Sequence, residues 1–175
     1  ERLQGQPDLL GEIEEMRRIL EGLTFIEQRS QDGFGHAVYQ AREFAAGEPI
    51  LLVTGDLLYR GPCRRELAEF YGRASGRSVS GVCRVGASLL HGYGTICGVR
   101  EAAEPRLIRI ERLIEKPSVA VARAELRMEG LPPDTWLGWF GLHALSPGIF
   151  GILEQLIRDN VRIGGEIQMT HAQEL

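Results

Sequence analysis

The sequence predicts an α/β protein with a Rossmann-like mixed sheet, part of which is antiparallel. Between residues 9 and 85, apolar runs of strand length alternate with segments of helical periodicity, as in doubly wound folds. The run 50–53 has four apolar residues in succession, which is typical of a parallel strand that helices cover on both faces. Two later β-rich runs, 93–99 and 107–114, flank a short polar connection, and this arrangement predicts an antiparallel hairpin.

The first half of the chain is expected to contain three helices and three strands. They follow one another as helix 9–20, strand 23–26, helix 36–45, strand 50–53, helix 62–74 and strand 78–85. The first helix begins after Asp8 and ends before Gly22, and its apolar residues form one stripe. Gly47 and Pro49 end the second helix.

The second half is expected to contain three strands and two helices. In chain order these are strand 93–99, strand 107–114, helix 119–128, strand 136–145 and helix 147–159. Ser146 is a candidate N-cap for the last helix, and Pro147 is a candidate first-turn residue because its ring sets a helical φ. Trp136 and Trp139 lie in the last strand and are expected in the core.

Length and composition favour a single domain. The chain has 175 residues, of which 43% are hydrophobic, and this is enough for one sizeable core. Its net charge of −4 offers no basic field for a nucleic acid. No apolar run reaches the ~18 residues that span a bilayer, and the first residues lack the pattern of a signal peptide, so we expect a cytoplasmic protein without membrane contact. The three cysteines lack disulfide or metal-binding spacing and are expected to be buried thiols.

A glycine-bearing turn is the first candidate for ligand binding. Gly33 and Gly35 lie between a predicted strand and a predicted helix, where glycines let backbone amides approach a flat or anionic ligand. A tight turn without a ligand is the alternative interpretation. Gln28 precedes the turn and offers an amide donor and a carbonyl acceptor, the combination that a pyrimidine edge requires.

Asp56 is a candidate ligand for Mg²⁺. It follows the predicted strand 50–53, at the carboxyl end where α/β sheets bind ligands. One carboxylate there can hold Mg²⁺ while phosphates and water complete the octahedron, although a turn or N-cap aspartate is the alternative. The sequence lacks the motifs of P-loop kinases, zinc proteases and serine hydrolases, and its four histidines are expected to be structural.

Lys116 is the only lysine among twenty basic residues. It follows Glu115 at the end of the predicted strand 107–114, and Pro117 stops the strand. An ammonium can meet phosphate oxygens as a point charge while a carboxylate accepts hydrogen bonds from hydroxyls, so this pair suits a sugar phosphate. A surface ion pair in a turn is the alternative.

Six segments together carry a resemblance to a known family. They are residues 27–38 (EQRSQDGFGHAV), 54–56 (TGD), 93–94 (YG), 114–117 (IEKP), 141–150 (GLHALSPGIF) and 165–170 (GEIQMT). In this order and at this spacing they resemble the bacterial UTP:glucose-1-phosphate uridylyltransferases and, more distantly, the wider sugar-phosphate nucleotidyltransferase family. The resemblance runs from residue 9 to residue 175, and it implies the fold of the nucleotide-diphospho-sugar transferases.

The resemblance implies transfer of a uridylyl group from UTP to glucose 1-phosphate, giving UDP-glucose and pyrophosphate, with Mg²⁺ as cofactor. It implies one nucleotidyltransferase domain over residues 1–175, with a nucleotide side at about 1–85 and a sugar side at about 86–175. Family members commonly associate, so a homo-oligomer is a further expectation. The implied site residues are Gln28 and Gly33 for uracil, Gly94, Glu115 and Lys116 for glucose 1-phosphate, Gly141 for the sugar pocket, and Asp56 (metal ligand) and Lys116 for catalysis.

The chain also departs from the family pattern. The family's amino-terminal glycine-rich loop and its carboxyl-terminal stretch with a second metal aspartate lie outside the sequence, so we expect a partial domain. His171 stands where the family usually has aspartate, Asp32 where lysine is common, and His143 where tyrosine is common. Two alternatives therefore stay open. One is a non-catalytic relative that binds a nucleotide sugar or regulates a partner enzyme, and the other is a nucleotidyltransferase for another nucleotide, such as dTTP, or another sugar phosphate.

Overall fold

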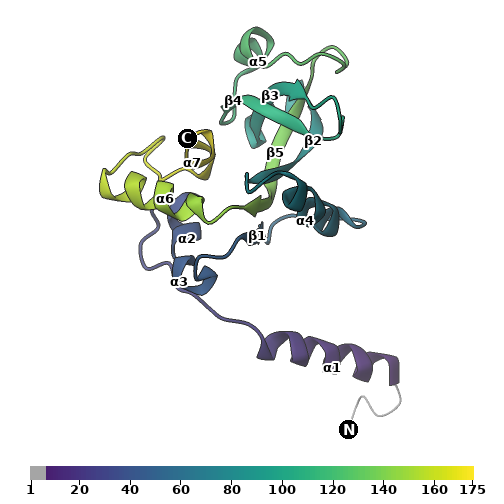
Figure 1. The fold of residues 1–175 in the computed structure, drawn as a ribbon, viewed down its shortest axis with the longest axis vertical. Coiled ribbons are helices and arrows are strands. Elements are labelled where there is room, and N and C mark those ends of the chain that lie inside the picture. Colours follow the sequence, from purple (N-terminus) through teal and green to yellow (C-terminus); the bar gives the residue numbers. More distant parts are fainter. Residues whose placement is uncertain (1–6) are drawn as a thin grey trace.

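A computed structural model describes residues 7–175, and residues 1–6, on which the expected absence of a signal peptide depends, lie outside the described part. Figure 1 shows a central sheet with short helices around it, and helix α1 standing away from the rest. The helices are α1 (Pro7–Glu21), α2 (Phe34–Tyr39), α3 (Arg42–Ala45), α4 (Cys63–Arg73), the 3-10 helix η1 (Ala87–Gly92), α5 (Val119–Glu125), α6 (Gly148–Arg158) and α7 (Met169–Glu174). The strands are β1 (Ile50–Val53), β2 (Val79–Gly86), β3 (Gly94–Arg100), β4 (Ile108–Ile114) and β5 (Thr135–Leu145).

Strand β5 is the axis of the sheet. Leu137 of β5 pairs with both Arg84 of β2 and Ile96 of β3, so β2 and β3 occupy opposite edges of β5. His143 of β5 likewise pairs with β1 and β2 at once. Strands β1 and β3 therefore share one edge of β5, one after the other, while β4 pairs with the outer side of β3.

The α/β class is confirmed, but the expected parallel pairing of strand 50–53 is wrong. Within the described residues β1 pairs with β5 alone, and the pairing is antiparallel. Leu51 and Val53 are exposed, so helices do not cover both faces of this strand. A run of four apolar residues cannot distinguish a central parallel strand from an antiparallel edge strand, because the neighbours that cover it come from elsewhere in the chain.

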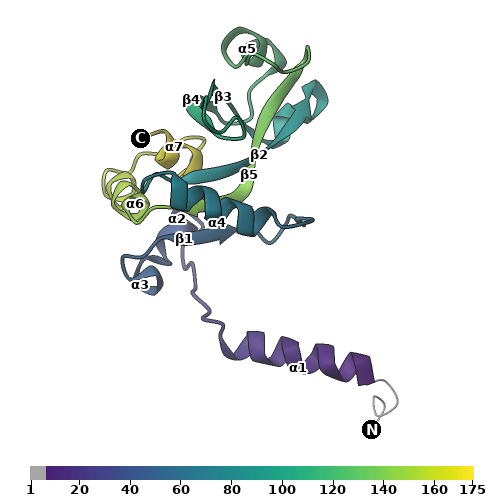
Figure 2. The ribbon, with the colours of Figure 1, turned by 45° about the vertical axis from the view of Figure 1, so that its right-hand side comes forward.

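The core forms on both faces of β5. Successive side chains of a strand point to opposite faces, and Leu142 packs with Leu67 of α4 while Leu145 packs in a larger cluster with Leu153 and Leu156 of α6. Figure 2 shows α2, α6 and α7 grouped together, and residues of all three contribute to the larger cluster. Both tryptophans of β5 are buried, as the sequence predicts.

Several predicted elements are confirmed with small differences at their ends. Helix 62–74 appears as α4, the hairpin as β3 and β4, and strand 136–145 as β5. The predicted helix 36–45 is divided into α2 and α3. Helices η1 and α7 had no counterpart in the sequence prediction, because both are too short to show a helical period.

Two predictions about the chain's local structure are wrong. Segment 23–26 is not a strand, and Phe25 in it is 87% exposed, because within the described residues no neighbouring strand pairs with it. Ser146 is not the N-cap of α6, which Pro147 provides. The backbone N–H of Ser146 instead donates to Ser78 Oγ at 3.0 Å, which ties the end of β5 to the start of β2.

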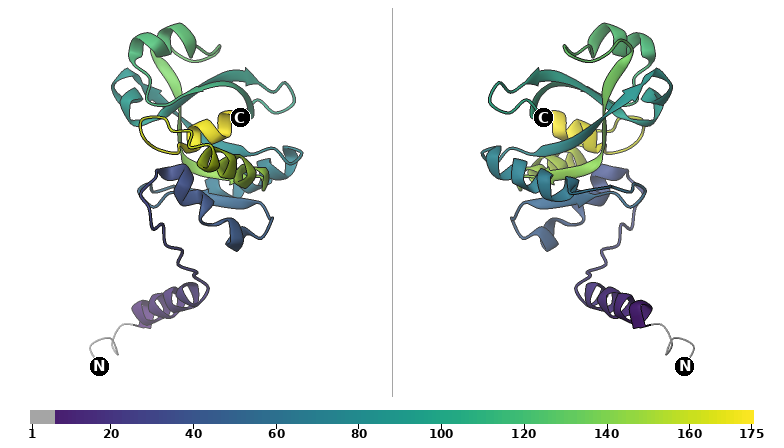
Figure 3. Two further views of the ribbon diagram at one scale, coloured as in Figure 1. Left: turned by 90° about the vertical axis from the view of Figure 1, so that its left-hand side faces the viewer. Right: turned by 90° about the vertical axis from the view of Figure 1, so that its right-hand side faces the viewer.

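The described residues add three observations to the composition analysis. None of the helices in residues 7–175 combines the length and the hydropathy that crossing a membrane requires. The three cysteines are free, but they are half-buried rather than fully buried. Helix α1 is confirmed, yet Ile19 and Leu20 on its apolar stripe are exposed, and α1 stands apart from the sheet in Figure 3 as well.

Gly98→Ala should destabilise the protein. Gly98 lies at the register shift of β3, and an added Cβ would overlap the carbonyl oxygen of Arg109 on β4. Backbone cannot yield as a side chain can, so we expect a loss of about 1–3 kcal/mol in the free energy of unfolding, measured by urea denaturation.

Gly151→Ala is the matched control. Gly151 lies in α6, and an added Cβ would meet nothing within 4 Å. The higher helix propensity of alanine should therefore stabilise this variant by up to about 1 kcal/mol. Equal effects of the two substitutions would contradict the close approach of β3 and β4 at Gly98.

Candidate functional site

On one edge of β5 the paired strand changes from β1 to β3, and this short break in the pairing is called the opening below. Candidate residues lie on both sides of it. β1 leaves this edge, and the Thr54 N–H that follows it still donates to the Gly141 carbonyl at 2.8 Å. β3 joins the same edge at Gly94, which is opposite Trp139. Because Trp139 and Gly141 are two residues apart on one strand, about 7 Å separates them. The chain beyond β1 and the start of β3 therefore face the same opening.

On the β3 side of the opening, three side chains close over Gly94. A Cβ on Gly94 would lie 3.1 Å from Glu115 Oε2, 3.3 Å from Thr170 Cγ2 and 3.5 Å from Trp139 Cε3. The structure therefore brings Gly94 and Glu115 together. A side chain at position 94 would push the carboxylate of Glu115 out of its place.

Glu115 has an unusual environment for a carboxylate. Burial raises its pKa above the ordinary value, and the nearby charge of Glu166 raises it further. The charge of Lys116 and a hydrogen bond from Thr170 lower the pKa, but they do not offset the burial. A partly desolvated carboxylate with one hydrogen bond already made keeps lone pairs for a polar ligand.

Lys116 follows strand β4 and has an unusual backbone conformation. Its φ of 45° is in the left-handed region, while its N–H still donates to the Tyr93 carbonyl at 3.2 Å. Its ammonium lies 3.8 Å from Glu115 Oε1, and the side chain is 59% exposed. An exposed pair of this kind contributes little to stability. The arrangement instead leaves the ammonium accessible beside the half-buried carboxylate.

The turn at Gly33 packs against a distant segment of backbone. A Cβ on Gly33, whose φ is 102°, would lie 2.7 Å from Glu166 Cβ, and a Cβ on Gly35 would lie 2.9 Å from the Ile167 carbonyl oxygen. Gly35 N–H donates to the same oxygen at 2.9 Å, and Ile167 N–H donates to the Asp32 carbonyl at 2.8 Å. Close packing alone therefore requires both glycines, and a ligand at Gly33 stays a prediction.

Segment 166–170 joins the two groups of candidate residues. Glu166 lies against Gly33, and its charge acts on Glu115. Thr170, which is 5% exposed, closes over Gly94 and hydrogen-bonds Glu115. No function is predicted for this segment from its residues, although it is one of the six that carry the family resemblance. A threonine followed by histidine after an apolar run is too common a pattern to mark a site without that resemblance.

Gln28 lies beside the Gly33 turn, as the sequence predicts. Its Nε2 donates to the Gly33 carbonyl at 3.1 Å and lies 3.0 Å from His36 Nδ1. Asp32 in the same turn forms an ion pair with Arg162 at 3.0 Å. A hydrogen bond from that guanidinium lowers the pKa of Asp32. The turn is therefore held by contacts on both sides.

Gly141 and Asp56 lie on the β1 side of the opening. A Cβ on Gly141 would overlap the side chain of Thr54, so the close approach of β1 explains this glycine without a ligand. Asp56 lies in an exposed turn two residues after Thr54. Asp56 follows β1 and Glu115 follows β4, and these two strands are connected through β5 and β3. No direct contact between the two carboxylates is seen in residues 7–175.

The acidic and histidine side chains in residues 7–175 include no group of three or more that could hold a metal ion by themselves. Asp56 alone can still fit Mg²⁺, since this ion is often held by one carboxylate and by substrate phosphates. His143 is structural, as predicted. It is fully buried, its Nδ1 lies 2.8 Å from Ser80 Oγ, and burial lowers its pKa to about 3, so the ring is neutral.

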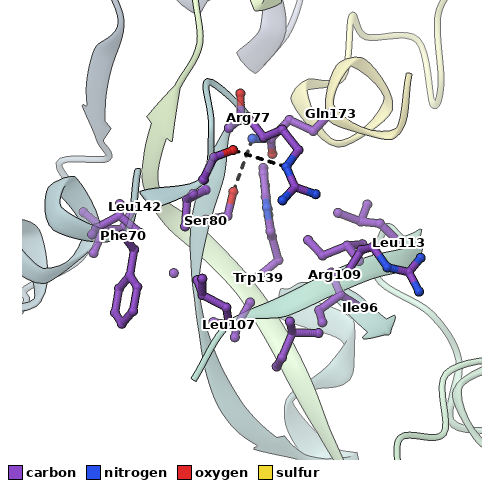
Figure 4. A pocket seen from close by; sticks show the side chains of 18 of the residues that line it. Phe70, Arg77, Ser80, Ile96, Leu107, Arg109, Leu113, Trp139, Leu142 and Gln173 are labelled. Atoms are coloured by element: carbon purple, nitrogen blue, oxygen red, sulfur yellow. Dashed lines mark hydrogen bonds between the residues drawn. The ribbon is translucent and has the colours of Figure 1, made fainter. Parts of the chain in front are cut away.

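A large cavity is lined by other residues, with Trp139 as the one it shares with the surroundings of Gly94. It has a volume of about 1300 Å³ and extends between α4, β2, β4 and the end of the chain (Figure 4). Trp139 and Leu113 form part of its apolar wall, while Gln173 Nε2 donates to Ser80 Oγ at 3.3 Å at its edge. None of the site residues that the sequence predicts lines this cavity.

Three comparisons with known proteins bear on this geometry. The family model described as nucleotidyl transferase matches residues 8–161. A UTP--glucose-1-phosphate uridylyltransferase 1 of Staphylococcus saprophyticus is 30% identical over 171 residues, which are 97% of this chain and 53% of the relative. The UTP--glucose-1-phosphate uridylyltransferase of Bacillus subtilis is 29% identical over 171 residues, 97% of this chain and 52% of the relative. The chain thus spans about half the length of these curated relatives.

Solved structures resemble the fold. A crystal structure of apo UDP-glucose pyrophosphorylase superposes with a TM-score of 0.73 at 23% identity, covering 99% of this chain and 59% of the other. A UDP-glucose pyrophosphorylase complexed with UDP-glucose superposes with a TM-score of 0.69 at 23% identity, covering 95% and 59%. This likeness confirms the predicted nucleotide-diphospho-sugar transferase fold.

Glu115→Gln should raise stability at neutral pH more than at acidic pH. The folded protein holds the proton of Glu115 more tightly than the unfolded chain does, because the pKa is raised above its ordinary value of 4.5. The contribution of Glu115 to the free energy of unfolding therefore falls as the pH rises through 4.5 and the raised pKa, and it stays low above both.

Urea denaturation on either side of this window measures the effect, at about pH 4 and about pH 7. Glu129→Gln is the control, since Glu129 is exposed. An equal gain from Glu115→Gln at both pH values would show that burial does not raise the pKa of Glu115.

Proposed function

Because the chain belongs to the nucleotidyl transferase family, we propose that it forms a large part of the active site of an enzyme that transfers a uridylyl group from UTP to glucose 1-phosphate. The products are UDP-glucose and pyrophosphate. The observation that carries the proposal is the grouping of Gly94, Glu115 and Thr170, with the ammonium of Lys116 beside them, at an opening that the Asp56 turn also borders. The names of the curated relatives support the choice of UTP and glucose 1-phosphate.

The residues on the β3 side are suited to a sugar phosphate. Lys116 supplies an accessible ammonium that meets phosphate oxygens and neutralises part of their charge. The carboxylate of Glu115 accepts hydrogen bonds from sugar hydroxyls, and Thr170 keeps it in place. Gly94 contributes its backbone beside these residues, and it lacks a side chain that would displace the Glu115 carboxylate.

The residues of the first half are suited to the nucleotide. Gln28 and the Gly33 turn bind the edge of the uracil, and this assigns the nucleotide side to about residues 1–85 and the sugar side to about residues 86–175. Asp56 holds Mg²⁺, which when bound neutralises charge on the nucleotide phosphates. Gly141 belongs to the sugar side, where it lines the sugar pocket, and Thr54 of the first half packs against it.

The reaction proposed is an in-line attack by a phosphate oxygen of glucose 1-phosphate on the α-phosphorus of UTP. The bond to the β-phosphate oxygen breaks, and pyrophosphate leaves with the bond's electron pair. Such a reaction depends on positioning and charge neutralisation more than on acid–base chemistry. The ammonium of Lys116 supplies the charge neutralisation, and the side chains around it position the substrate. A cytoplasmic location and a homo-oligomer remain predictions from the sequence.

A relative that binds a nucleotide sugar without turning it over is the second candidate. His171, which stands where the family usually has aspartate, favours it, because an imidazole replaces the carboxylate that a hard cation prefers. Its Nδ1 lies 3.6 Å from Glu174 Oε2, too far for a hydrogen bond, and has no hydrogen-bond partner in residues 7–175. Pyrophosphate release from UTP and glucose 1-phosphate by the intact protein distinguishes the two candidates. Binding of UDP-glucose without release of pyrophosphate would favour the second, and a preference for dTTP over UTP would change the substrate.

Lys116→Ala should lower kcat/KM for glucose 1-phosphate by about 100-fold or more, because the ammonium that neutralises the attacking phosphate is lost. The fold should survive, since the side chain is 59% exposed. Lys116→Met keeps the apolar stem and should lose as much activity. Arg158→Ala, which removes an exposed cation at the end of α6, is the control. Unchanged turnover of Lys116→Ala would refute the role of Lys116.

Asp56→Asn should raise the Mg²⁺ concentration at which pyrophosphate release is half-maximal, by about tenfold or more, because a neutral amide is a weaker ligand for a hard cation. A titration of activity with MgCl₂ measures this. Asp159→Asn, an exposed aspartate after α6, should leave the midpoint in place. An unshifted midpoint for Asp56→Asn would remove Asp56 from the metal site.

A further inference from the structure

The large cavity is bordered by two strand edges that lack a partner. In residues 7–175, β2 pairs with β5 alone and β4 pairs with β3 alone, so each strand keeps one edge unpaired. Every residue of segments 79–82 and 108–113 lines the cavity. Successive residues of a strand point to opposite faces, so an unbroken run of lining residues indicates that the strand's edge lies toward the cavity. Backbone N–H and C=O groups of both strands are therefore available to another strand.

Apolar walls flank the edge of β2 on both of its faces. On one face Val82 packs with Trp139 and Ile96, and on the other face Val79 packs in the cluster that contains Leu142. Figure 4 shows Leu142 on one side of this strand and Trp139 and Ile96 on the other. The volume of about 1300 Å³ exceeds the roughly 300–1,000 Å³ of small-molecule sites. An extended polypeptide segment with apolar side chains suits these walls, because both of its faces would be covered.

The chain itself carries a segment of this character. Residues 23–26 are predicted as a strand from the sequence, but no strand pairs with them in the described part of the chain. Leu23, Phe25 and Ile26 are all exposed, and Phe25 is 87% exposed. Figures 2 and 3 show the connection between α1 and α2 running free of the sheet. The segment has four residues, as many as the lining segment 79–82 of β2.

We propose that segment 23–26 of a second copy of this chain adds a strand to the free edge of β2 inside the cavity, so that the protein associates with itself. Alternation places Leu23 and Phe25 against one wall and Ile26 against the other. Glu27 follows the segment, and Arg77 lines the cavity just before β2. Attraction between these two charges favours a strand that runs antiparallel to β2.

The test measures the mass of the purified protein by light scattering after gel filtration, from about 1 to about 200 μM. We expect the mass to rise with concentration from one copy to two or more. Phe25→Asp places a charge between the apolar walls and should raise the midpoint concentration about tenfold or more. Leu89→Asp makes the same kind of change at an exposed leucine of η1 that does not line the cavity, and it should leave the midpoint in place.

A mixing experiment separates a specific contact from a folding defect. Leu107→Asp places a charge in the cavity at a residue that belongs to none of the apolar core clusters, and it should also weaken association. The Phe25→Asp protein keeps an intact cavity, while the Leu107→Asp protein keeps an intact segment. An equal mixture of the two should therefore associate more strongly than either variant alone. Thermal unfolding of each variant shows whether it is folded.

A synthetic peptide of residues 21–29 gives a direct measurement on the unaltered protein. It should bind and dissociate the assemblies, whereas the same peptide with Phe25→Asp should not. A protein that stays a single copy over the whole range and does not bind the peptide overturns the proposal. Association that Phe25→Asp leaves unchanged, or that Leu89→Asp weakens equally, overturns it as well. These outcomes leave the proposed uridylyl transfer standing, because none of its predicted site residues lines the cavity.

Discussion

The backbone contact between the Gly33 turn and segment 166–168 is the constraint on which the site depends. The turn and the segment are more than 130 residues apart in sequence, yet Gly35 and Ile167 are joined by a hydrogen bond of 2.9 Å, and Ile167 reaches back to Asp32 at 2.8 Å. A side chain on either glycine would overlap this backbone. The turn therefore keeps its position because the chain packs against it, and Gln28 and His36 take their positions from the turn.

The same segment also positions residues on the other side of the site. Beyond Ile167 the chain enters α7, whose buried Thr170 touches Gly94 and hydrogen-bonds Glu115. The opening at the edge of β5 completes the frame, since β1 last pairs at Leu142 and β3 first pairs at Trp139. An enzyme that works by positioning needs such a frame more than it needs reactive side chains.

Few charged side chains take part in this frame. Most ion pairs in the described residues join exposed arginines to exposed acids, and pairs of that kind contribute little to stability. Glu115 differs because burial raises its pKa while the neighbouring ammonium compensates only in part. A carboxylate that is costly to bury and is still retained beside an accessible cation is typical of a functional site. The neutral, fully buried His143 is the opposite case, because its hydrogen bond to Ser80 and its packing on Trp139 serve the core.

Much of the architecture could be predicted from local pattern. Helix α4, the β3–β4 hairpin and β5 each show a clear period or a turn signal, and the motif order led to the family and to the residues that border the opening. Segment 23–26 shows the limit of such patterns, because its apolar residues suit a strand but a strand exists only where another one pairs with it. The antiparallel pairing of β1 could not be predicted for the same reason.

By itself the sequence determined most of the helices and strands, the family they belong to, and that Glu115 and Lys116 follow a strand together. Only the tertiary structure decided that segment 166–170 holds the turn and the carboxylate in one frame, that close packing requires Gly33, Gly35 and Gly141, and that the amide of Gln28 donates to the Gly33 carbonyl. The reason is physical. Periodicity reports the preference of each residue for water or core, whereas these contacts join residues far apart in the chain and depend on how the whole sheet packs.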